Sequence, residues 1–214
     1  MIGVTGFGAT LLAVLLGALV LAARAAPAEV DASAAVMPGM RVLRGEPEAV
    51  VRALLDEKVL LMDGAGEVVR AYVLFDRPLD RVFELLADTD RQGEFRSELE
   101  DLATVAKLPD GHVDEYHIRI LFVEVGYRLR YRLDPERKQI RWELDPSFEN
   151  PMRRVEGSWE LFAMEPTRTL GRLSTLVNVG DELPGFLQDQ LTRTTLPRTL
   201  ERCRRWVNAD GAAP

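Results

Sequence analysis

The chain of 214 residues has a single cysteine, Cys203, and only two histidines, His112 and His117. A single cysteine cannot form an intramolecular disulfide, so stability must come from packing, and we expect Cys203 to be a small buried side chain. The histidines stand five positions apart in one predicted strand and point to opposite faces. Neither has a cysteine or carboxylate at a ligand spacing, so the sequence predicts no metal site.

Basic side chains are fewer than acidic ones. The 27 Lys and Arg residues are outnumbered by 34 Asp and Glu residues, which gives a formal net charge of -7. Phosphate backbones require a basic surface, so this balance argues against a nucleic-acid partner. No glycine-rich phosphate loop follows a strand, and no Gly-x-Ser-x-Gly elbow is present. We therefore expect no cofactor and no hydrolase of that type. The 47% hydrophobic content is that of a soluble globular domain with a real core.

The N-terminal segment lacks charge altogether up to Arg24. The apolar run over 10–23 and the small residues after it resemble a secretory signal peptide, with Ala23-Arg24-Ala25 fitting an A-x-A cleavage site. No Lys or Arg precedes the run, so a retained membrane anchor is the alternative. We expect 1–25 to be a signal peptide or anchor, and 26–45, rich in Ala, Pro and Gly, to be a linker. The protein is then exported, to the periplasm or outside the cell, and a retained N-terminal segment would hold it at a membrane.

A clean alternation of apolar and charged residues occupies 124–145, EVGYRLRYRLDPERKQIRWELD. Apolar side chains from Val125 to Leu133 share one face of an extended strand, and Arg128, Arg130 and Arg132 share the other. Asp134 and the four residues after it supply turn chemistry, after which the alternation resumes. The pattern predicts a hairpin with one solvated face, whose arginines pair across strands with Glu143 and Asp145.

The same reading applied along the chain predicts an α+β domain over 46–210. A helix opens at Glu46-Pro47-Glu48, a second covers 78–88, a short third covers 90–97, and one long helix runs from 184 to 208. Further strands are expected at 58–62, 67–76, 99–108, 113–122, 155–165 and 169–179. A curved antiparallel sheet needs a cover for its concave face, and only the last helix is long enough to provide it.

Several stretches resemble a known superfamily. RAYVLFDRPLDRVFELLADTDRQGEF (70–95), RRVEGSWELF (153–162), LPGFLQDQLTRTTLPRTLERCRRW (183–206) and the lead-in ALLDEKVLLMD (53–63) are similar to START-like (SRPBCC) proteins, in the polyketide-cyclase/dehydrase and coenzyme Q-binding branch. The resemblance covers about residues 46 to 208. It implies the helix-grip fold, a curved antiparallel sheet wrapped on a long C-terminal helix. The matching motifs are structural, so they indicate the fold and leave the activity open.

The resemblance also implies a ligand cavity between the sheet and the last helix, for which an ordinary solid core is the alternative. Alternation places Tyr116, Ile118, Ile120 and Phe122 on the inner face of one strand, with aromatic side chains that have polar tips on its neighbours. The residues expected to line the cavity are Tyr116, Ile118, Ile120, Tyr127, Leu129, Tyr131, Trp142, Trp159, Leu173, Thr175, Leu187, Gln190, Leu191 and Thr194.

The last helix changes its apolar phase. Leu187, Leu191 and Thr194 share one side of an ideal helix, but the apolar residues from Leu196 to Val207 lie on nearly the opposite side. Pro197 stands at the change and removes a backbone donor, so we predict a kink or break there. Either the two halves pack on different partners, or the N-terminal half is a movable lid over the cavity.

These features favour a protein that binds, and carries or sequesters, a hydrophobic small molecule or lipid without catalysis. The charged segment 91–97 replaces the apolar residues that the superfamily usually has there, and it predicts either a rim that orients a polar head group or a solvated surface. One alternative is a polyketide aromatase/cyclase-type enzyme that uses the same cavity, with Tyr116 and Tyr131 as candidates for proton transfer. Another is an interaction module without a ligand.

Overall fold

The computed structural model describes residues 37–62, 68–181 and 183–212. The predicted signal peptide or anchor, residues 1–25, lies outside the described residues, so it stays a prediction. Among the described residues, no helix is long and apolar enough to cross a membrane.

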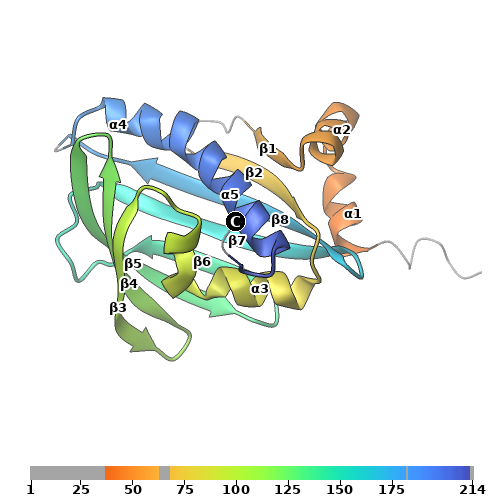
Figure 1. Ribbon diagram of the computed structural model, residues 1–214, viewed down its shortest axis with the longest axis horizontal. Helices are drawn as coiled ribbons and strands as arrows, with labels where there is room; N and C mark the ends of the chain where they lie inside the picture. The colour runs from red at the N-terminus through yellow and green to blue at the C-terminus, as the bar shows by residue number, and fades with distance from the viewer. Residues whose placement is uncertain (1–36, 63–67, 182, 213–214) are drawn as a thin grey trace, which may run out of the picture. The chain divides into compact units, whose positions relative to one another are not determined.

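One curved antiparallel sheet forms the body of the domain (Figure 1). Its eight strands follow the spatial order β1-β2-β8-β7-β6-β5-β4-β3, so β2 pairs with the last strand in the chain and β1 forms the edge beside β2. The strands are β1 (Val59–Met62), β2 (Val68–Phe75), β3 (Leu99–Leu108), β4 (Gly111–Ile120), β5 (Val123–Asp134), β6 (Gln139–Leu144), β7 (Arg154–Glu165) and β8 (Arg168–Asn178).

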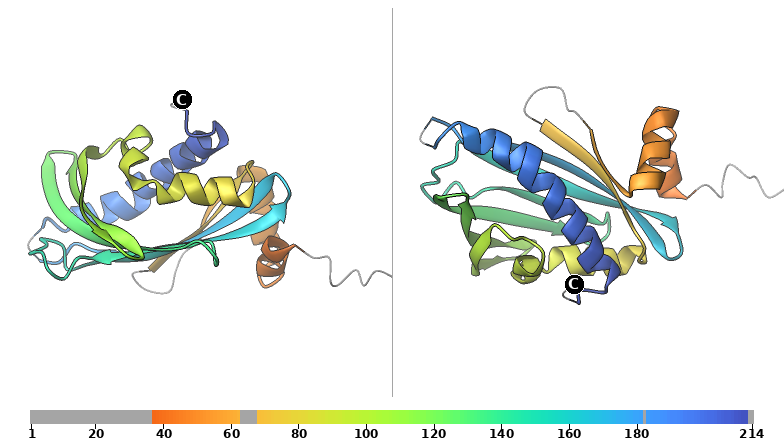
Figure 2. Two further views of the ribbon diagram at one scale, coloured as in Figure 1. Left: turned by 90° about the horizontal axis from the view of Figure 1, so that it is seen from below. Right: turned by 45° about the horizontal axis from the view of Figure 1, so that its top comes forward.

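Helices cover both faces of this sheet. The C-terminal helix is one helical run made of α4 (Phe186–Asp189), the π-helical segment η2 (Gln190–Thr195) and α5 (Leu196–Asn208). It crosses the concave face together with α3 (Leu79–Ala87) and the short 3-10 helix η1 (Thr89–Glu94), as Figure 2 shows. Helices α1 (Pro38–Leu43) and α2 (Glu48–Glu57) contribute to a smaller apolar cluster on the outer face. This is the α+β helix-grip architecture predicted from the sequence.

The β5–β6 hairpin confirms the alternation. Val125, Tyr127, Leu129 and Tyr131 of β5 are all buried. The arginines between them face outward and pair with acidic side chains: the shortest N–O distances are 3.0 Å for Arg130–Asp145 and 3.6 Å for Arg132–Glu143, while Arg128 pairs with Glu115 at 2.6 Å. The arginine row is thus a cross-strand-paired outer surface.

Two expectations from the sequence need correction. Phe122 is not on the inner face: β4 ends at Ile120, and Phe122 lies in the turn to β5, where it is 79% exposed. The alternation could not show where the strand ends and the turn begins. The range expected to be a linker, 26–45, contains α1, in which Gly39 lies against Met164 and Leu43 is buried. That part of the range packs on the domain instead of leading up to it.

Candidate functional site

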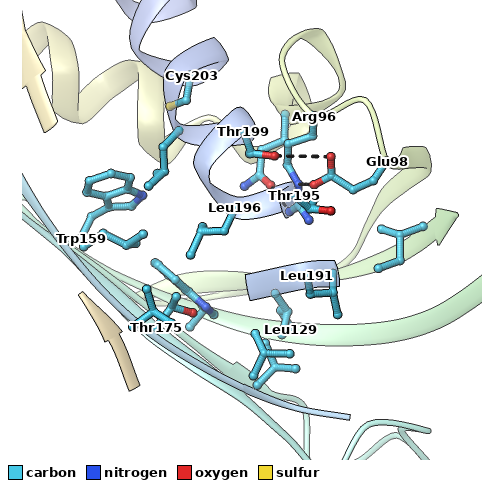
Figure 3. A pocket seen from close by; sticks show the side chains of 18 of the residues that line it. Arg96, Glu98, Leu129, Trp159, Thr175, Leu191, Thr195, Leu196, Thr199 and Cys203 are labelled. Carbon is cyan, nitrogen blue, oxygen red and sulfur yellow. Dashed lines mark hydrogen bonds and ion pairs between the residues drawn. The ribbon is translucent and has the colours of Figure 1, made fainter. Parts of the chain in front are cut away.

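A cavity of about 190 Å³, partly open to solvent, lies between the sheet and the C-terminal helix. The β-strands contribute most of its apolar walls, and the helix closes the opposite side (Figure 3). Nine of the residues predicted from the sequence line it: Ile118, Tyr127, Leu129, Tyr131, Trp142, Trp159, Leu173, Thr175 and Leu191.

The other five predicted residues lie elsewhere. Tyr116 is fully buried behind the wall, where its hydroxyl is 2.8 Å from that of Tyr131. Ile120 and Leu187 belong to the hydrophobic core next to the cavity. Gln190 and Thr194 are half-buried on the C-terminal helix, outside the set of residues that line the cavity.

The π-helical segment determines which helix residues face the cavity. The backbone stays helical through Pro197, and the irregularity predicted there takes the form of η2, which ends two residues earlier at Thr195. A π turn holds more residues than an α turn, so each residue rotates the chain less. This offsets the predicted phase change. The residues that reach the cavity then form one stripe four positions apart, comprising Leu191, Thr192, Thr195, Leu196, Thr199, Leu200 and Cys203.

Gly157 lets the ring of Trp142 lie flat against the sheet and form part of the wall. The two residues are register partners on β7 and β6. A Cβ at Gly157 would stand 2.4 Å from the Trp142 Cζ2 atom and 2.6 Å from the Ser174 carbonyl oxygen. No side chain fits there without displacing the indole. The absence of a side chain at Gly157 thus lets Trp142 take its place in the cavity wall.

Arg96 brings a positive charge to this apolar cavity. It follows η1, and its guanidinium donates from Nε to a Glu98 carboxylate oxygen at 3.0 Å and from Nη1 to the Gln92 side-chain oxygen at 2.9 Å. The Gln92 oxygen also accepts a bond from the Tyr116 hydroxyl at 3.3 Å. The arginine lies over the Tyr116 ring, with its Cζ atom 5.4 Å from the ring centroid. Arg96, Glu98 and Gln92 all belong to the lining.

One edge of the Arg96 guanidinium makes no hydrogen bond to the described residues. Within the described residues, Nη2 has no hydrogen-bond partner, and the side chain is 19% exposed. Thr199 donates to Glu98 at 3.5 Å from the helix, and Figure 3 shows Thr195 and Thr199 beside the arginine at one end of the cavity. Leu129 and Trp159 stand on the other sides of the space, away from this polar end.

The protonation states of these groups follow from burial. Desolvation alone would lower the pKa of Arg96, but Tyr127 and Glu98 outweigh it, so the pKa of Arg96 is raised and the charge is retained. Burial raises the pKa of Tyr131 to about 12 and that of Cys203 to about 12. At neutral pH the cavity therefore presents a cationic donor, a neutral phenol and a neutral thiol.

A second polar cluster supports the wall from behind. Asp114 is fully buried and accepts hydrogen bonds from Thr89 at 2.6 Å and Thr104 at 2.7 Å. His112 Nε2 lies 3.2 Å from the same carboxylate, and the imidazole stacks on the Tyr131 ring with centroids 5.1 Å apart. This cluster joins η1 to β3 and β4 and fixes Tyr131. The described residues contain no group of three or more His, Cys, Asp or Glu side chains that could hold a metal ion.

Sequence reasoning left the polar end of the cavity as one of two alternatives. The segment 91–97 was expected to be either a charged rim that orients a polar group or a solvated surface, and Gln92, Phe95 and Arg96 of this segment line the cavity. Other members of the segment fix the helix: Glu94 accepts a bond of 2.8 Å from the Trp206 indole and pairs with Arg91 at 2.7 Å. The presence of Phe95 beside Arg96 was the available signal, because an aromatic residue in a short amphipathic helix marks a buried side.

Comparison with solved structures gives several folds that match most of this domain. A protein from Thermus thermophilus, TTHA0849, is 21% identical, with 68% of this chain and 99% of that chain covered and a TM-score of 0.58. The Zhui aromatase/cyclase from Streptomyces sp. R1128 is 19% identical over 67% and 92% of the two chains, with a TM-score of 0.56. A STAR-related lipid transfer protein from Xanthomonas axonopodis is 14% identical over 70% and 98%, with a TM-score of 0.53.

A scan of protein-family models gives no match, and a search of curated protein sequences gives none either. The identities to the solved structures are low, so these likenesses establish the fold and not the activity. This chain has an eight-stranded curved antiparallel sheet with a long C-terminal helix across its concave face, and the matched chains are covered almost completely. The chain has the helix-grip fold of the START-like superfamily.

Proposed function

We propose that this protein binds a hydrophobic small molecule, or one end of a lipid, in the cavity beneath its C-terminal helix, and that it carries or sequesters that molecule. The observation that supports this most directly is the cavity itself, which has apolar walls and a single polar end at Arg96. Apolar ligand surface gains about 25 cal/mol for each Å² removed from water, so such walls retain a ligand without any bond-making chemistry.

The cavity volume limits the size of the ligand. An apolar cavity of about 150 Å³ holds benzene, so 190 Å³ suits a single ring with a short substituent or a short branched chain. A complete sterol or a long acyl chain exceeds this volume and would require either the C-terminal helix to move or part of the ligand to remain outside. We therefore propose a ligand, or a buried portion of one, of roughly single-ring size.

The charge balance at Arg96 favours one kind of polar group on the ligand. Glu98 already neutralises the guanidinium, and a second carboxylate would leave a net negative charge in an apolar site. A neutral carbonyl or hydroxyl oxygen avoids this cost and can accept a hydrogen bond from the free Nη2 edge. Thr195 and Thr199 add hydroxyl groups at the same end. The ligand is thus a neutral oxygen-bearing hydrophobe.

A matched pair of probes tests this assignment. Acetophenone and isopropylbenzene are close in size, but the first has a planar carbonyl group where the second has a tetrahedral carbon that bears a second methyl group. Binding is followed by the fluorescence of Trp142 and Trp159, which line the cavity. For each protein we compare the dissociation constant for isopropylbenzene with that for acetophenone. This ratio should be about tenfold larger in the full-length protein than in a variant with Arg96→Met and Glu98→Met, because the variant loses one hydrogen bond from a charged donor. Benzoate should bind more weakly than acetophenone.

No binding of either probe would remove the proposal. Equal preference in both proteins would keep the cavity but remove the role of Arg96. The variant Arg119→Met is the control, because Arg119 forms exposed ion pairs on the outer surface with Glu100 and Glu124. It should bind both probes as the unaltered protein does.

The aromatase/cyclase alternative uses the same cavity but has less support. A cyclase needs a group that abstracts a proton from the bound chain. The raised pKa of Tyr131 keeps its phenol protonated, so it can donate a hydrogen bond but is a poor base at neutral pH. Tyr116 does not reach the cavity, and the Glu98 carboxylate is held by Arg96 and Thr199. Binding without chemistry is the function that this arrangement supports best.

A further inference from the structure

Three large apolar side chains are exposed together at one end of the domain. Leu121 is 62% exposed and Phe122 is 79% exposed in the turn between β4 and β5, and Phe186 at the start of α4 is 43% exposed. The rings of Phe122 and Phe186 pack with centroids 5.7 Å apart. Figure 1 shows the β4–β5 turn beside α4 at the tip of the molecule. We call Leu121, Phe122 and Phe186 the apolar tip.

The turn chemistry of the apolar tip is costly for the fold. Ile120 and Val123 are register partners, so Leu121 and Phe122 form a two-residue loop. Leu121 has a φ of 57°, and the first central position of such a turn favours Gly because a side chain there is strained. The sequence thus places a bulky apolar pair where a small polar residue would be more stable and more soluble. Both side chains of this pair remain mostly exposed, and the ring of Phe122 packs against that of Phe186.

We propose that the apolar tip inserts into the interface of a lipid bilayer. A protein partner or a second copy of this chain is disfavoured by area: three such side chains offer on the order of 400 Å², about half of what each partner contributes to a standard interface. A projecting turn with Leu and Phe at its end is instead suited to shallow insertion among lipid head groups. A few apolar side chains suffice for insertion, because a fluid bilayer, unlike a protein partner, needs no surface of complementary shape.

The charges around the apolar tip identify the kind of bilayer. Arg119 is paired with Glu100 and Glu124, and Arg193 on the C-terminal helix is paired with Asp189. These basic side chains are therefore neutralised locally, and the whole chain has a formal net charge of -7. Attraction to anionic lipid needs a surplus of basic groups near the surface. The apolar tip thus fits a neutral, zwitterionic surface, and its binding should depend little on salt.

The apolar tip lies next to one end of the cavity. Ile118, three residues before Leu121, lines the cavity, and so does Leu191, about one helical turn beyond Phe186. A tip buried in lipid would place this end of the cavity against the bilayer, so that a hydrophobic ligand could exchange without crossing water. Membrane contact itself does not require the cavity to be filled, and it can therefore be tested apart from the proposed function.

A fluorophore at the tip provides the test. Cys203 is buried, so a cysteine introduced by Leu121→Cys in the full-length protein can be labelled selectively with an environment-sensitive dye. Val105→Cys is the matched control, because Val105 is an apolar residue of β3 that is 44% exposed outside the tip. Each labelled protein is mixed with phosphatidylcholine vesicles, with and without brominated acyl chains, in low and high salt. A local probe reports insertion of the tip whatever the N-terminal segment does.

We expect the dye at position 121 to shift to shorter wavelength and to be quenched by the brominated lipid at both salt concentrations, while the dye at position 105 does neither. Adding Phe122→Ser should reduce vesicle partitioning of the tip about tenfold, because one exposed phenyl ring no longer enters lipid. An unchanged spectrum at position 121 would overturn the proposal. So would a shift that grows with protein concentration in the absence of vesicles, which would assign the tip to contact between copies. Probe binding in the cavity should survive Phe122→Ser in either case.

Discussion

Arg96 places a charged group at the boundary of an apolar cavity, and its partners determine what that group can do. Glu98 compensates the charge, Gln92 orients the guanidinium, and one edge remains open. Removing only one member of a buried ion pair leaves its partner unpaired in a poorly solvated site, which costs more than the pair itself contributes. Two predictions at this scale follow from the burial of polar groups around the cavity.

The first concerns Arg96→Met. We expect it to lower the free energy of unfolding by about 3 kcal/mol, because the buried Glu98 carboxylate loses its counter-ion. Adding Glu98→Met should recover most of that loss. Urea denaturation of the three proteins measures both values. The control Arg119→Met removes exposed pairs and should cost less than about 1 kcal/mol. Equal losses for Arg96→Met and Arg119→Met would show that the cavity pair is effectively solvated.

The second concerns alkaline pH. The pKa of Tyr131 is about 12 in the folded protein against 10.0 ordinarily, so between these values the folded state holds a proton that the unfolded state has lost. Stability is therefore complete below pH 10 and falls as pH rises, by up to about 1.4 kcal/mol per pH unit for this one group. Tyr131→Phe should remove that part of the slope when stability is measured from pH 9 to 11.5. An identical slope would mean that Tyr131 titrates normally.

Among the elements, the strands were the easiest to predict. Alternation gave the β5–β6 hairpin and the inner face of β4 because one face is solvated and the other is buried, which is a strong period-two signal. The end of β4 was missed because Phe122 continues the alternation into an exposed turn. The π-helical segment was missed because its hydrogen bonding depends on tertiary packing. Its sequence signal, the shift of apolar phase before Pro197, was detected but predicted a kink or break.

Packing of β6 on β7 gives a prediction for Gly157→Ala. The new methyl group would overlap the Trp142 ring and the Ser174 carbonyl group, so we expect a loss of about 2 kcal/mol in the free energy of unfolding and a changed tryptophan fluorescence. Gly185→Ala is the matched control, since a Cβ there meets nothing within 4 Å. It should change stability by less than about 0.5 kcal/mol. A harmless Gly157→Ala would mean that the indole is not held against the strand.

The C-terminal helix gives a prediction about opening. The N-terminal part of this helix buries fewer side chains than α5 does, and segments with few buried contacts open more readily. Amides of η2 should therefore exchange with solvent faster than those of α5, as hydrogen-exchange NMR measures. Filling the cavity with ligand should slow η2 more than α5 if this half is a lid. Equal protection of both segments, with and without ligand, would contradict the lid hypothesis.

For the whole molecule, the sequence predicted the architecture and most of the cavity wall, but for 91–97 it left a charged rim and a solvated surface as alternatives. The wall residues belong to strands whose burial pattern is periodic. Arg96 and Glu98 lie in the irregular connection between η1 and β3, where no period indicates which side chains point inward. The π-helical segment η2 changes which threonines of the C-terminal helix face the cavity. Thr194 was expected in the wall, whereas Thr192 and Thr195 occupy it.

The cavity volume is also a property of the whole molecule that no local pattern gives. It depends on how far the C-terminal helix stands from the sheet, and that distance is set by contacts at its two ends. Trp206 anchors the C-terminal end through Glu94, and Gln188 bonds the Val177 carbonyl oxygen at 2.6 Å near the other end. The helix is thus held by hydrogen bonds at both ends, and the cavity lies beneath its middle.

Native mass spectrometry of the full-length protein, purified without added ligand and then extracted with organic solvent, tests the central claim most directly. The account predicts a bound hydrophobic molecule at one per chain, with a neutral oxygen group, that is lost or weakened in the variant with Arg96→Met and Glu98→Met. A bare protein mass, unchanged after incubation with mixed lipids and with single-ring ketones, would contradict it and would show that the cavity does not serve as a binding site.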